Sequence, residues 1–337
     1  MVLVSLRRLV LPLLCAVSAT SVVAACAGPP SSSSSSATTS SATSFTPVSL
    51  DNCGDKVTVS SPPTRLVTLN QGATEVALAL GLEGRMVGTA YLDDEISPRY
   101  AAAYKTVPVL SKEYPSQETF LAARPDFAYA AYASAFESKA VGTRNELQQK
   151  RIGTYLSPFG CADVADKAAP TFESAWKEIT QVGSIFDVTK KAESVVADQQ
   201  GELADVRKQA AGKGLKILWY DSADKTPFVG GGGGGPQLVI DAVGGTNIFA
   251  NIKGGWGDGS WEKVVSAQPD VIVLADASWD TAAKKKAYLK NDPVLKKLEA
   301  VQDNAFVVVP FSESTPGVRL VEGAHSVSDQ LAALNLK

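Results

Sequence analysis

Short apolar runs alternate with amphipathic stretches along most of the chain. The strand-like runs are rich in β-branched residues, and in the helix-like stretches the apolar residues recur every three or four positions. The predicted strands cover residues 65–69, 86–90, 216–220 and 305–310. The predicted helices cover residues 74–80, 237–243 and 322–334. This alternation favours an α/β fold with mainly parallel sheets.

One helix–strand unit occurs twice, at a constant offset of 144 residues. Residues 116–130 align without a gap on residues 260–274. Each copy begins with a serine that can cap a helix, and each has a glutamate in the first turn. Each helix ends at a Pro-Asp pair, because proline disfavours a helical conformation in the residue before it. Two equivalent units this far apart predict two similar lobes, and two lobes usually enclose a ligand site.

Between the two copies the pattern changes to one sustained amphipathic helix over residues 171–186. Its position midway between the repeats makes it the candidate connector between the lobes. We therefore expect an N-terminal lobe over residues 50–169, a connector helix over 170–187 and a C-terminal lobe over 188–337.

Residues 1–25 have the pattern of a secretory signal, with two arginines, an apolar run and small residues before a boundary. The residues before Cys26 resemble a bacterial lipoprotein cleavage site, although Val23 replaces the usual leucine. This resemblance implies a diacylated Cys26 that anchors the protein to the membrane. A plain signal peptide and a single-span anchor are the alternatives, and the short run broken by Pro12 disfavours a span. Residues 26–49 are rich in serine and threonine, which predicts a flexible tether.

The remaining cysteines favour an exported protein. Cys15 would leave with the signal and Cys26 would carry lipid, so Cys53 and Cys161 remain to pair in an oxidising compartment. Such a disulfide closes a loop of about 100 residues and is worth on the order of 4 kcal/mol. Two buried free thiols are the alternative.

Charge and histidine content exclude several functions. The 32 basic and 35 acidic residues are nearly balanced and scattered, so we expect no nucleic-acid partner. His325 is the only histidine of the chain, so a zinc or copper site built on several histidines is excluded. Two Ser-x-x-Lys matches, at Ser174 and Ser222, fit a pattern of serine enzymes, but Lys-Thr-Gly is absent and we expect no catalysis.

Several segments together resemble substrate-binding proteins for ferric siderophores, haem and vitamin B12. They are the strand at 65–69, Thr74-Glu75, Ala79-Leu80-Gly81, Val87-Gly88 and the two Ser-x-Glu…Pro-Asp units. The resemblance covers about residues 50–335, and the segments around Cys53 and Cys161 look most like actinobacterial ferric-siderophore-binding lipoproteins. It implies two Rossmann-like α/β lobes joined by a single rigid connector helix, with the ligand in the cleft between them.

The resemblance also implies an ABC-type permease as partner. In relatives one surface glutamate per lobe docks on arginines of the permease, and the matching positions are Glu118 and Glu262. The alternative is that both glutamates only complement helix dipoles.

Ligand residues are expected at strand ends and in the loops that follow them, since open α/β sheets bind ligands there. This criterion selects Gln71, Tyr91, Tyr132, Tyr220, Phe228, Trp256 and Arg319. Aromatic rings offer flat faces to a ferric chelate or porphyrin, and Arg319 offers a bidentate partner to anionic oxygens. Each aromatic residue also fits an ordinary core or rim position. Gly230–Gly235 lack the lysine of a phosphate loop and predict either close backbone approach to the ligand or a flexible crossover.

The sequence thus predicts a monomeric lipoprotein on the extracytoplasmic face of the cell membrane, with no cofactor, metal site or catalysis of its own. It would capture a ferric siderophore and deliver it to an ABC-type permease. The alternative is a haem- or corrinoid-binding receptor that is not dedicated to one transporter.

Overall fold

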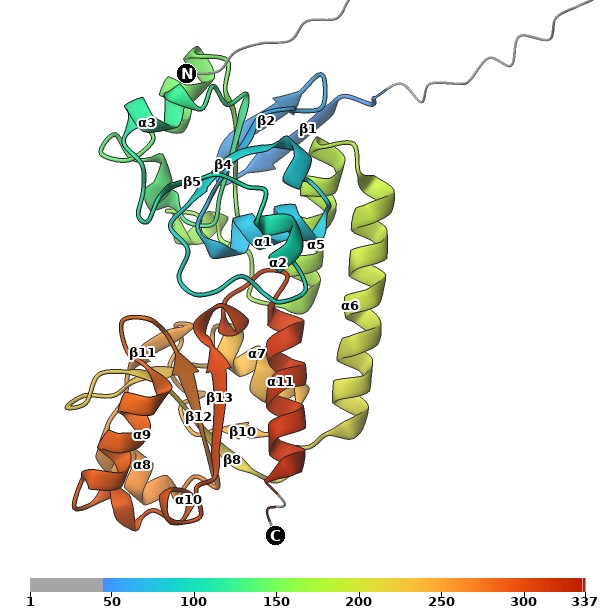
Figure 1. Cartoon of the computed structure of the whole chain (residues 1–337). Helices are drawn as coiled ribbons and strands as arrows, with labels where there is room; N and C mark the ends of the chain where they lie inside the picture. The colour runs from blue at the N-terminus through green and yellow to red at the C-terminus, as the bar shows by residue number, and fades with distance from the viewer. Residues whose placement is uncertain (1–44, 335, 337) are drawn as a thin grey trace, which may run out of the picture. The chain divides into compact units, whose positions relative to one another are not determined.

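Two β-sheets, each with its own helices, form the framework of the protein (Figure 1). The structure is a computed structural model that describes residues 45–334 and residue 336. The predicted signal peptide, the lipidation site Cys26 and residues 26–44 of the predicted tether lie outside the described residues. Within the described part, no helix is long and apolar enough to cross a membrane.

The N-terminal lobe contains a five-stranded, fully parallel sheet in the order β5-β4-β3-β6-β7. Its strands are β3 (Leu66–Leu69), β4 (Met86–Ala90), β5 (Val109–Ser111), β6 (Phe127–Ala130) and β7 (Gly153–Leu156). Its helices are α1 (Gln71–Ala79), α2 (Ala101–Tyr104), α3 (Gln117–Ala122) and α4 (Arg144–Gln149). An antiparallel hairpin of β1 (Val48–Asn52) and β2 (Asp55–Val59) precedes the sheet.

The C-terminal lobe contains a six-stranded mixed sheet in the order β11-β9-β8-β12-β13, with β10 also paired to β8. Its strands are β8 (Lys216–Ser222), β9 (Phe228–Gly230), β10 (Thr246–Asn247), β11 (Trp256–Asp258), β12 (Val271–Asp276) and β13 (Phe306–Pro310). Its helices are α7 (Gly235–Ala242), α8 (Trp261–Ala267), α9 (Ala282–Asn291), α10 (Glu299–Gln302) and α11 (Leu320–Ala333). The predicted α/β class with two lobes is confirmed.

The repeated unit forms α3 and β6 in one lobe and α8 and β12 in the other. In both copies the serine before the helix accepts a hydrogen bond from a backbone N–H three residues later. The aspartate of each Pro-Asp pair then joins two strands. The carboxylates of Asp126 and Asp270 accept the N–H groups of Arg65 and Lys216 at 2.9 and 2.7 Å, just where β3 and β8 begin. The repeat therefore fixes the register of each sheet as well as the helix start.

Two helices, α5 (Phe172–Ile185) and α6 (Thr189–Gln209), connect the sheets (Figure 1). In α5, Phe172 belongs to a core cluster of the C-terminal lobe and Ile179 to one of the N-terminal lobe. In α6, Ala192 packs in the N-terminal cluster and Leu203 in the C-terminal one. The sequence assigned the connection to residues 170–187 alone, whereas the packing divides it between both helices. The cause is length, since the 21 residues of α6 extend over about 30 Å.

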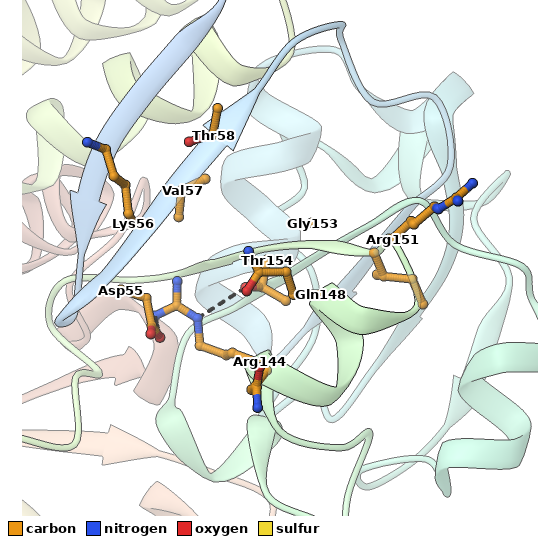
Figure 2. A pocket seen from close by; sticks show the side chains of 11 residues that line it. Asp55, Lys56, Val57, Thr58, Arg144, Gln148, Arg151, Gly153 and Thr154 are labelled. Carbon is orange, nitrogen blue, oxygen red and sulfur yellow. Dashed lines mark hydrogen bonds and ion pairs between the residues drawn. The ribbon is translucent and has the colours of Figure 1, made fainter.

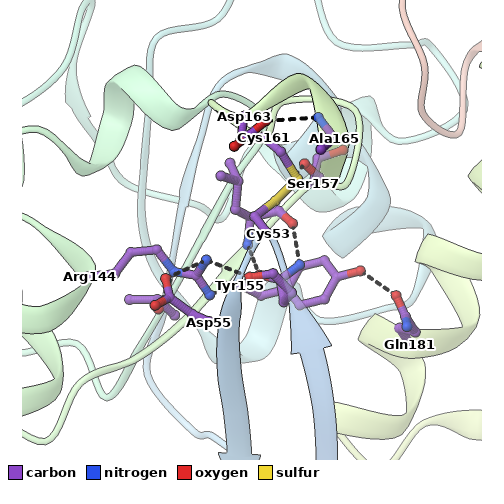
Figure 3. Close-up of a disulfide and its surroundings, with 12 residues drawn as sticks. Cys53, Asp55, Arg144, Tyr155, Ser157, Cys161, Asp163, Ala165 and Gln181 are labelled. Atoms are coloured by element: carbon purple, nitrogen blue, oxygen red, sulfur yellow. Dashed lines mark hydrogen bonds and ion pairs between the residues drawn. A yellow bond between two sulfur atoms is a disulfide. The ribbon is translucent and has the colours of Figure 1, made fainter. Parts of the chain in front are cut away.

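A disulfide ties the turn of the β1–β2 hairpin to the loop after β7 (Figure 3). It joins Cys53 and Cys161, 108 positions apart in sequence, so the predicted pairing is confirmed. Next to it, the Asn52 side chain donates to the carbonyl of Leu156 at 2.7 Å and accepts the N–H of Leu156 at 2.9 Å. The hairpin is thus held to the edge of the first sheet by a covalent bond and by buried hydrogen bonds.

The glycine run at 230–235 packs against another part of the same lobe. The N–H groups of residues 231–233 donate to carbonyl oxygens within residues 252–255. A Cβ atom on Gly232 would overlap the carbonyl oxygen of Ala250. The glycines therefore permit a close backbone approach, but the approaching group is the protein's own chain.

Candidate ligand-binding site

A cavity of about 780 Å³ lies between the two lobes. The N-terminal lobe contributes Tyr91, Asp93 and Tyr132, and the C-terminal lobe contributes Trp279 and Phe311. An adjoining cavity of about 540 Å³ shares the three N-terminal residues and extends to Tyr114. These residues follow β4, β5, β6, β12 and β13, at the carboxyl ends of parallel strands, where open α/β sheets bind ligands. We call these two cavities together the interlobe cleft.

Aromatic rings from both lobes form the walls of the interlobe cleft. Tyr91 and Tyr114 meet edge to face with ring centroids 4.5 Å apart. On the C-terminal lobe, Trp279 and Phe311 also meet edge to face, with ring centroids 5.1 Å apart. Tyr132 is 40% exposed and Trp279 is 54% exposed. Large, rigid rings that remain open to solvent suit a bulky ligand with apolar or flat faces.

The loop after β4 carries Asp93 and is held in place by Gln71. The Gln71 side-chain oxygen accepts the N–H groups of Asp93 and Asp94 at 3.2 and 3.5 Å. Its side-chain nitrogen donates to Glu75 at 2.9 Å. Gln71 is 1% exposed, so it positions the loop and does not reach the cavity.

Arg319 is surrounded by four carboxylates from both lobes, which we call the Arg319 cluster. Its guanidinium lies 3.6 Å from Glu75 and 3.4 Å from Asp94, both of the N-terminal lobe. It also lies 2.9 Å from Glu313 and 3.4 Å from Glu322, both of the C-terminal lobe. Since Arg319 is only 4% exposed, its charge is directed to these protein carboxylates and does not line the cleft.

The Arg319 cluster contains four carboxylates and one guanidinium, and burial raises the pKa values of three of these carboxyl groups. Burial raises the pKa of Glu75 to about 7, although Arg319 acts in the opposite direction. Burial likewise raises the pKa values of Asp94 and Glu313. Asp94 also accepts the backbone N–H and the hydroxyl of Ser312 at 2.9 and 2.8 Å, from the other lobe. The cluster therefore ties the two lobes together behind the ligand cavity.

Besides Gln71 and Arg319, five aromatic ligand residues were predicted from the sequence, and the structure separates them into three groups. Tyr91 and Tyr132 line the interlobe cleft. Trp256 lies behind the cleft wall, with its ring 5.9 Å from that of Phe311, and Phe228 is partly buried in β9. Tyr220 is fully buried, and its hydroxyl donates to the Ala223 carbonyl at 3.1 Å.

Four residues that line the interlobe cleft were not predicted from the sequence: Asp93, Tyr114, Trp279 and Phe311. The strand-end criterion could have found three of them, because Asp93, Trp279 and Phe311 lie in the loops that follow β4, β12 and β13. Tyr114 belongs to the cleft wall because its ring contacts that of Tyr91, and this contact is visible only in the folded structure.

Glu118 and Glu262 occupy matching surface positions, in the first turns of α3 and α8. Both side chains are exposed. Neither forms an ion pair with another residue of the described chain. Both carboxylates are therefore accessible to a partner.

A further cavity of about 510 Å³ lies on the N-terminal lobe, lined by residues of β2, α4 and β7 and their flanks (Figure 2). Arg144 lines this cavity, but its guanidinium is already paired with other groups of the protein. Arg144 donates to the Asn52 carbonyl at 2.8 Å and to the Thr154 hydroxyl at 3.1 Å, and it pairs with Asp55 at 3.0 Å. This arginine holds the β1–β2 hairpin, so its guanidinium is already paired with protein groups.

Comparison with known proteins agrees with this architecture. A family described as periplasmic binding protein matches residues 66–313. The chain is 24% identical over 295 residues to an uncharacterized ABC transporter substrate-binding lipoprotein, YvrC, of Bacillus subtilis, covering 86% of this chain and 87% of that protein. It is 23% identical over 241 residues to the vitamin B12-binding protein of Vibrio parahaemolyticus, covering 70% of this chain and 81% of that protein.

Among solved structures, a periplasmic binding protein of Veillonella parvula is 30% identical with a TM-score of 0.74, covering 85% of this chain and 98% of that one. A protein described as an ABC-type Fe3+-hydroxamate transport system, from Saccharomonospora viridis, is 24% identical with a TM-score of 0.69. It covers 84% of this chain and 98% of that one.

The family match extends over most of both lobes and includes both copies of the repeat. The relatives are substrate-binding proteins of ABC transporters, so the prediction of a non-enzymatic, extracytoplasmic binding protein is confirmed at this level. The chain belongs to the periplasmic binding protein family.

Proposed function

We propose that this protein is a lipid-anchored receptor that captures a ferric siderophore in the interlobe cleft and delivers it to its permease. The observation that carries the proposal is the set of aromatic rings that both lobes direct into one cavity. A chelated ferric ion presents a bulky organic surface, which such rings can contact over a large area. The Saccharomonospora viridis neighbour is described as part of an Fe3+-hydroxamate transport system, and another neighbour as a petrobactin-binding protein of Bacillus subtilis.

Haem or a corrinoid is the second candidate ligand. Other neighbours are described as haem-binding proteins, and curated relatives as vitamin B12-binding proteins. Both ligands have flat rings that fit between aromatic walls. Haem also carries carboxylates, and in this cleft the arginine expected to pair with them, Arg319, is occupied by four protein carboxylates. This difference favours the siderophore over haem.

Anchoring through Cys26 and the tether over residues 26–49 belong to the proposal. Two acyl chains on one cysteine give stable attachment to a membrane. A flexible tether would let the two lobes move above the membrane while the protein stays close to its permease. We propose that the protein works as a monomer in this position.

The ligand can be identified by tryptophan quenching of the purified protein, since Trp279 lies in the cavity wall. Ferric siderophores, an iron-free siderophore, haemin and cobalamin would be titrated in parallel. We expect submicromolar binding of one ferric siderophore and at least about tenfold weaker binding of haemin and of the iron-free form. Tighter binding of haemin or cobalamin would replace the siderophore by that ligand.

Permease docking can be separated from ligand binding in a double variant, Glu118→Ala/Glu262→Ala. Because complementary surface charge orients a complex and speeds its formation, we expect uptake to fall at least about tenfold with an unchanged Kd for the ligand. The matched control is Glu173→Ala, which removes an exposed glutamate from the first turn of capped helix α5. Unimpaired uptake in the double variant, or an equal loss in the control, would contradict the docking role.

A further inference from the structure

Asp93 is a carboxylate without a protein partner at the centre of the interlobe cleft. It lines both of the adjoining cavities, together with Tyr91 and Tyr132. Its backbone N–H donates to Gln71, so the position of the residue is fixed. Within residues 45–334 no side chain or backbone group donates a hydrogen bond to its carboxylate, and no lysine or arginine forms an ion pair with it.

The next carboxylate along the loop, that of Asp94, has several protein partners. Asp94 faces the other lobe and is paired with Ser312 and Arg319. Asp93 thus remains available while its neighbour holds the lobes. Burial, and after it the charge of Asp94, raises the pKa of Asp93 to about 6. The carboxylate is therefore ionised at neutral pH, and a nearby positive charge would stabilise this ionised form.

The cations in or near the cleft are paired with protein carboxylates or are exposed beside one. Arg319 is held by four carboxylates. Lys139 pairs with Glu137 at 2.9 Å, and its side chain is 82% exposed. Lys112 and Glu113 also line the larger cavity, and both are exposed and carry opposite charges. Apart from this exposed pair of opposite charges, the lining of the larger cavity is mainly aromatic and contains one half-buried carboxylate, that of Asp93.

Aromatic faces and a carboxylate are together the groups that proteins use to hold an organic cation. Ring faces attract a positive charge through their quadrupole, and a carboxylate accepts charge-assisted hydrogen bonds from an ammonium group. Tyr91 and Tyr132 flank Asp93, and Trp279 and Phe311 face it from the other lobe. The same surface would disfavour an anionic ligand, because the carboxylate would be brought against a like charge without a counter-ion.

We propose that Asp93 makes the cleft selective for a ligand that carries a positive charge, by binding an ammonium or another cationic donor of that ligand. This inference rests on the proposed function, since it concerns the ligand of the same cleft. It defines the substrate class as a cationic chelate or cationic corrinoid.

The test uses two pairs of probes that differ by one positive charge. The first pair is ferrioxamine B, whose free ammonium leaves it cationic at pH 7, and its N-acetylated, uncharged derivative. The second pair is aquocobalamin, which is cationic at pH 7, and the uncharged cyanocobalamin. Affinities of the wild-type protein, of Asp93→Asn and of Glu95→Gln would be measured by tryptophan quenching. Glu95 is the matched control, because it is an exposed carboxylate of the same loop that lines neither cavity.

In the wild-type protein we expect the cationic member of at least one pair to bind at least about tenfold more tightly than the neutral member. Asp93→Asn should bring this ratio close to one, and Glu95→Gln should leave it unchanged. Equal affinities within both pairs in the wild type, or a preference that survives in Asp93→Asn, would overturn the inference. A preference confined to the corrinoid pair, with no binding of either ferric chelate, would support the role of Asp93 and overturn the siderophore function. Binding of none of the four probes would overturn both.

Discussion

Replacing Arg319 by methionine is expected to lower the free energy of unfolding by about 3–5 kcal/mol. Methionine has a similar length and can occupy the same space, but it leaves Glu75, Asp94, Glu313 and Glu322 without their common cation. Removing one partner from a buried ionic group is costly because the remaining charges stay buried without compensation. The hydrogen bonds from Arg319 to Ser312, at 2.5 Å, and to the Glu95 carbonyl, at 3.2 Å, are lost as well.

Urea denaturation followed by tryptophan fluorescence would measure this change. The control is Arg99→Met, because Arg99 pairs with Glu202 and Glu322 but is 50% exposed. Exposed ion pairs contribute little, so we expect this control to lose less than about 1 kcal/mol. A combined Arg319→Met/Glu75→Gln variant should recover part of the loss, since it removes one of the uncompensated carboxylates. A loss in Arg319→Met no larger than in the control would show that the cluster does not stabilise the folded lobes.

Removing the disulfide with Cys53→Ser/Cys161→Ser is expected to lower the free energy of unfolding by about 4–5 kcal/mol. The bond spans 108 positions, and cross-linking so long a loop removes much conformational freedom from the unfolded chain. The native hairpin would keep its hydrogen bonds between Asn52 and Leu156 and between Arg144 and Asn52. We therefore expect the variant to fold to the same structure with reduced stability.

The same denaturation experiment on the wild-type protein with and without a reducing agent provides the control. Reduced wild type and the double-serine variant should unfold at the same urea concentration. If both were as stable as the oxidised protein, the loop-closure argument would fail for this chain.

The loop after β4 connects the proposed ligand site to the contact between the lobes. Asp93 faces the cavity, while Asp94 reaches across to Ser312 and Arg319. A ligand that moves Asp93 would therefore also displace a residue that holds the lobes. Together with the two connecting helices, this arrangement favours a small rocking motion of the lobes on ligand binding.

The sequence by itself determined the fold class, the repeated helix–strand unit and the disulfide. These features depend on local or compositional signals, such as a capping serine, a Pro-Asp pair that ends a helix, and two cysteines left to pair. The position of Tyr91 and Tyr132 at the interlobe cleft could also be predicted from the sequence, because each follows a predicted parallel strand. Element boundaries agree within a few residues for the same reason.

Tertiary structure alone decided the roles of Tyr220, Arg319 and Asp93. Tyr220 lies inside β8, which continues to Ser222 and is covered on both faces, so apolar alternation gives no sign of which way its ring points. Arg319 finds Asp94 and Glu75 more than 220 positions away in sequence, and nothing local indicates that a charged residue will be neutralised from the other lobe. Asp93 and Asp94 are adjacent and chemically identical, yet one binds the protein and the other faces the cavity. Their difference arises because burial and partnership depend on which distant segments pack against each side of a loop.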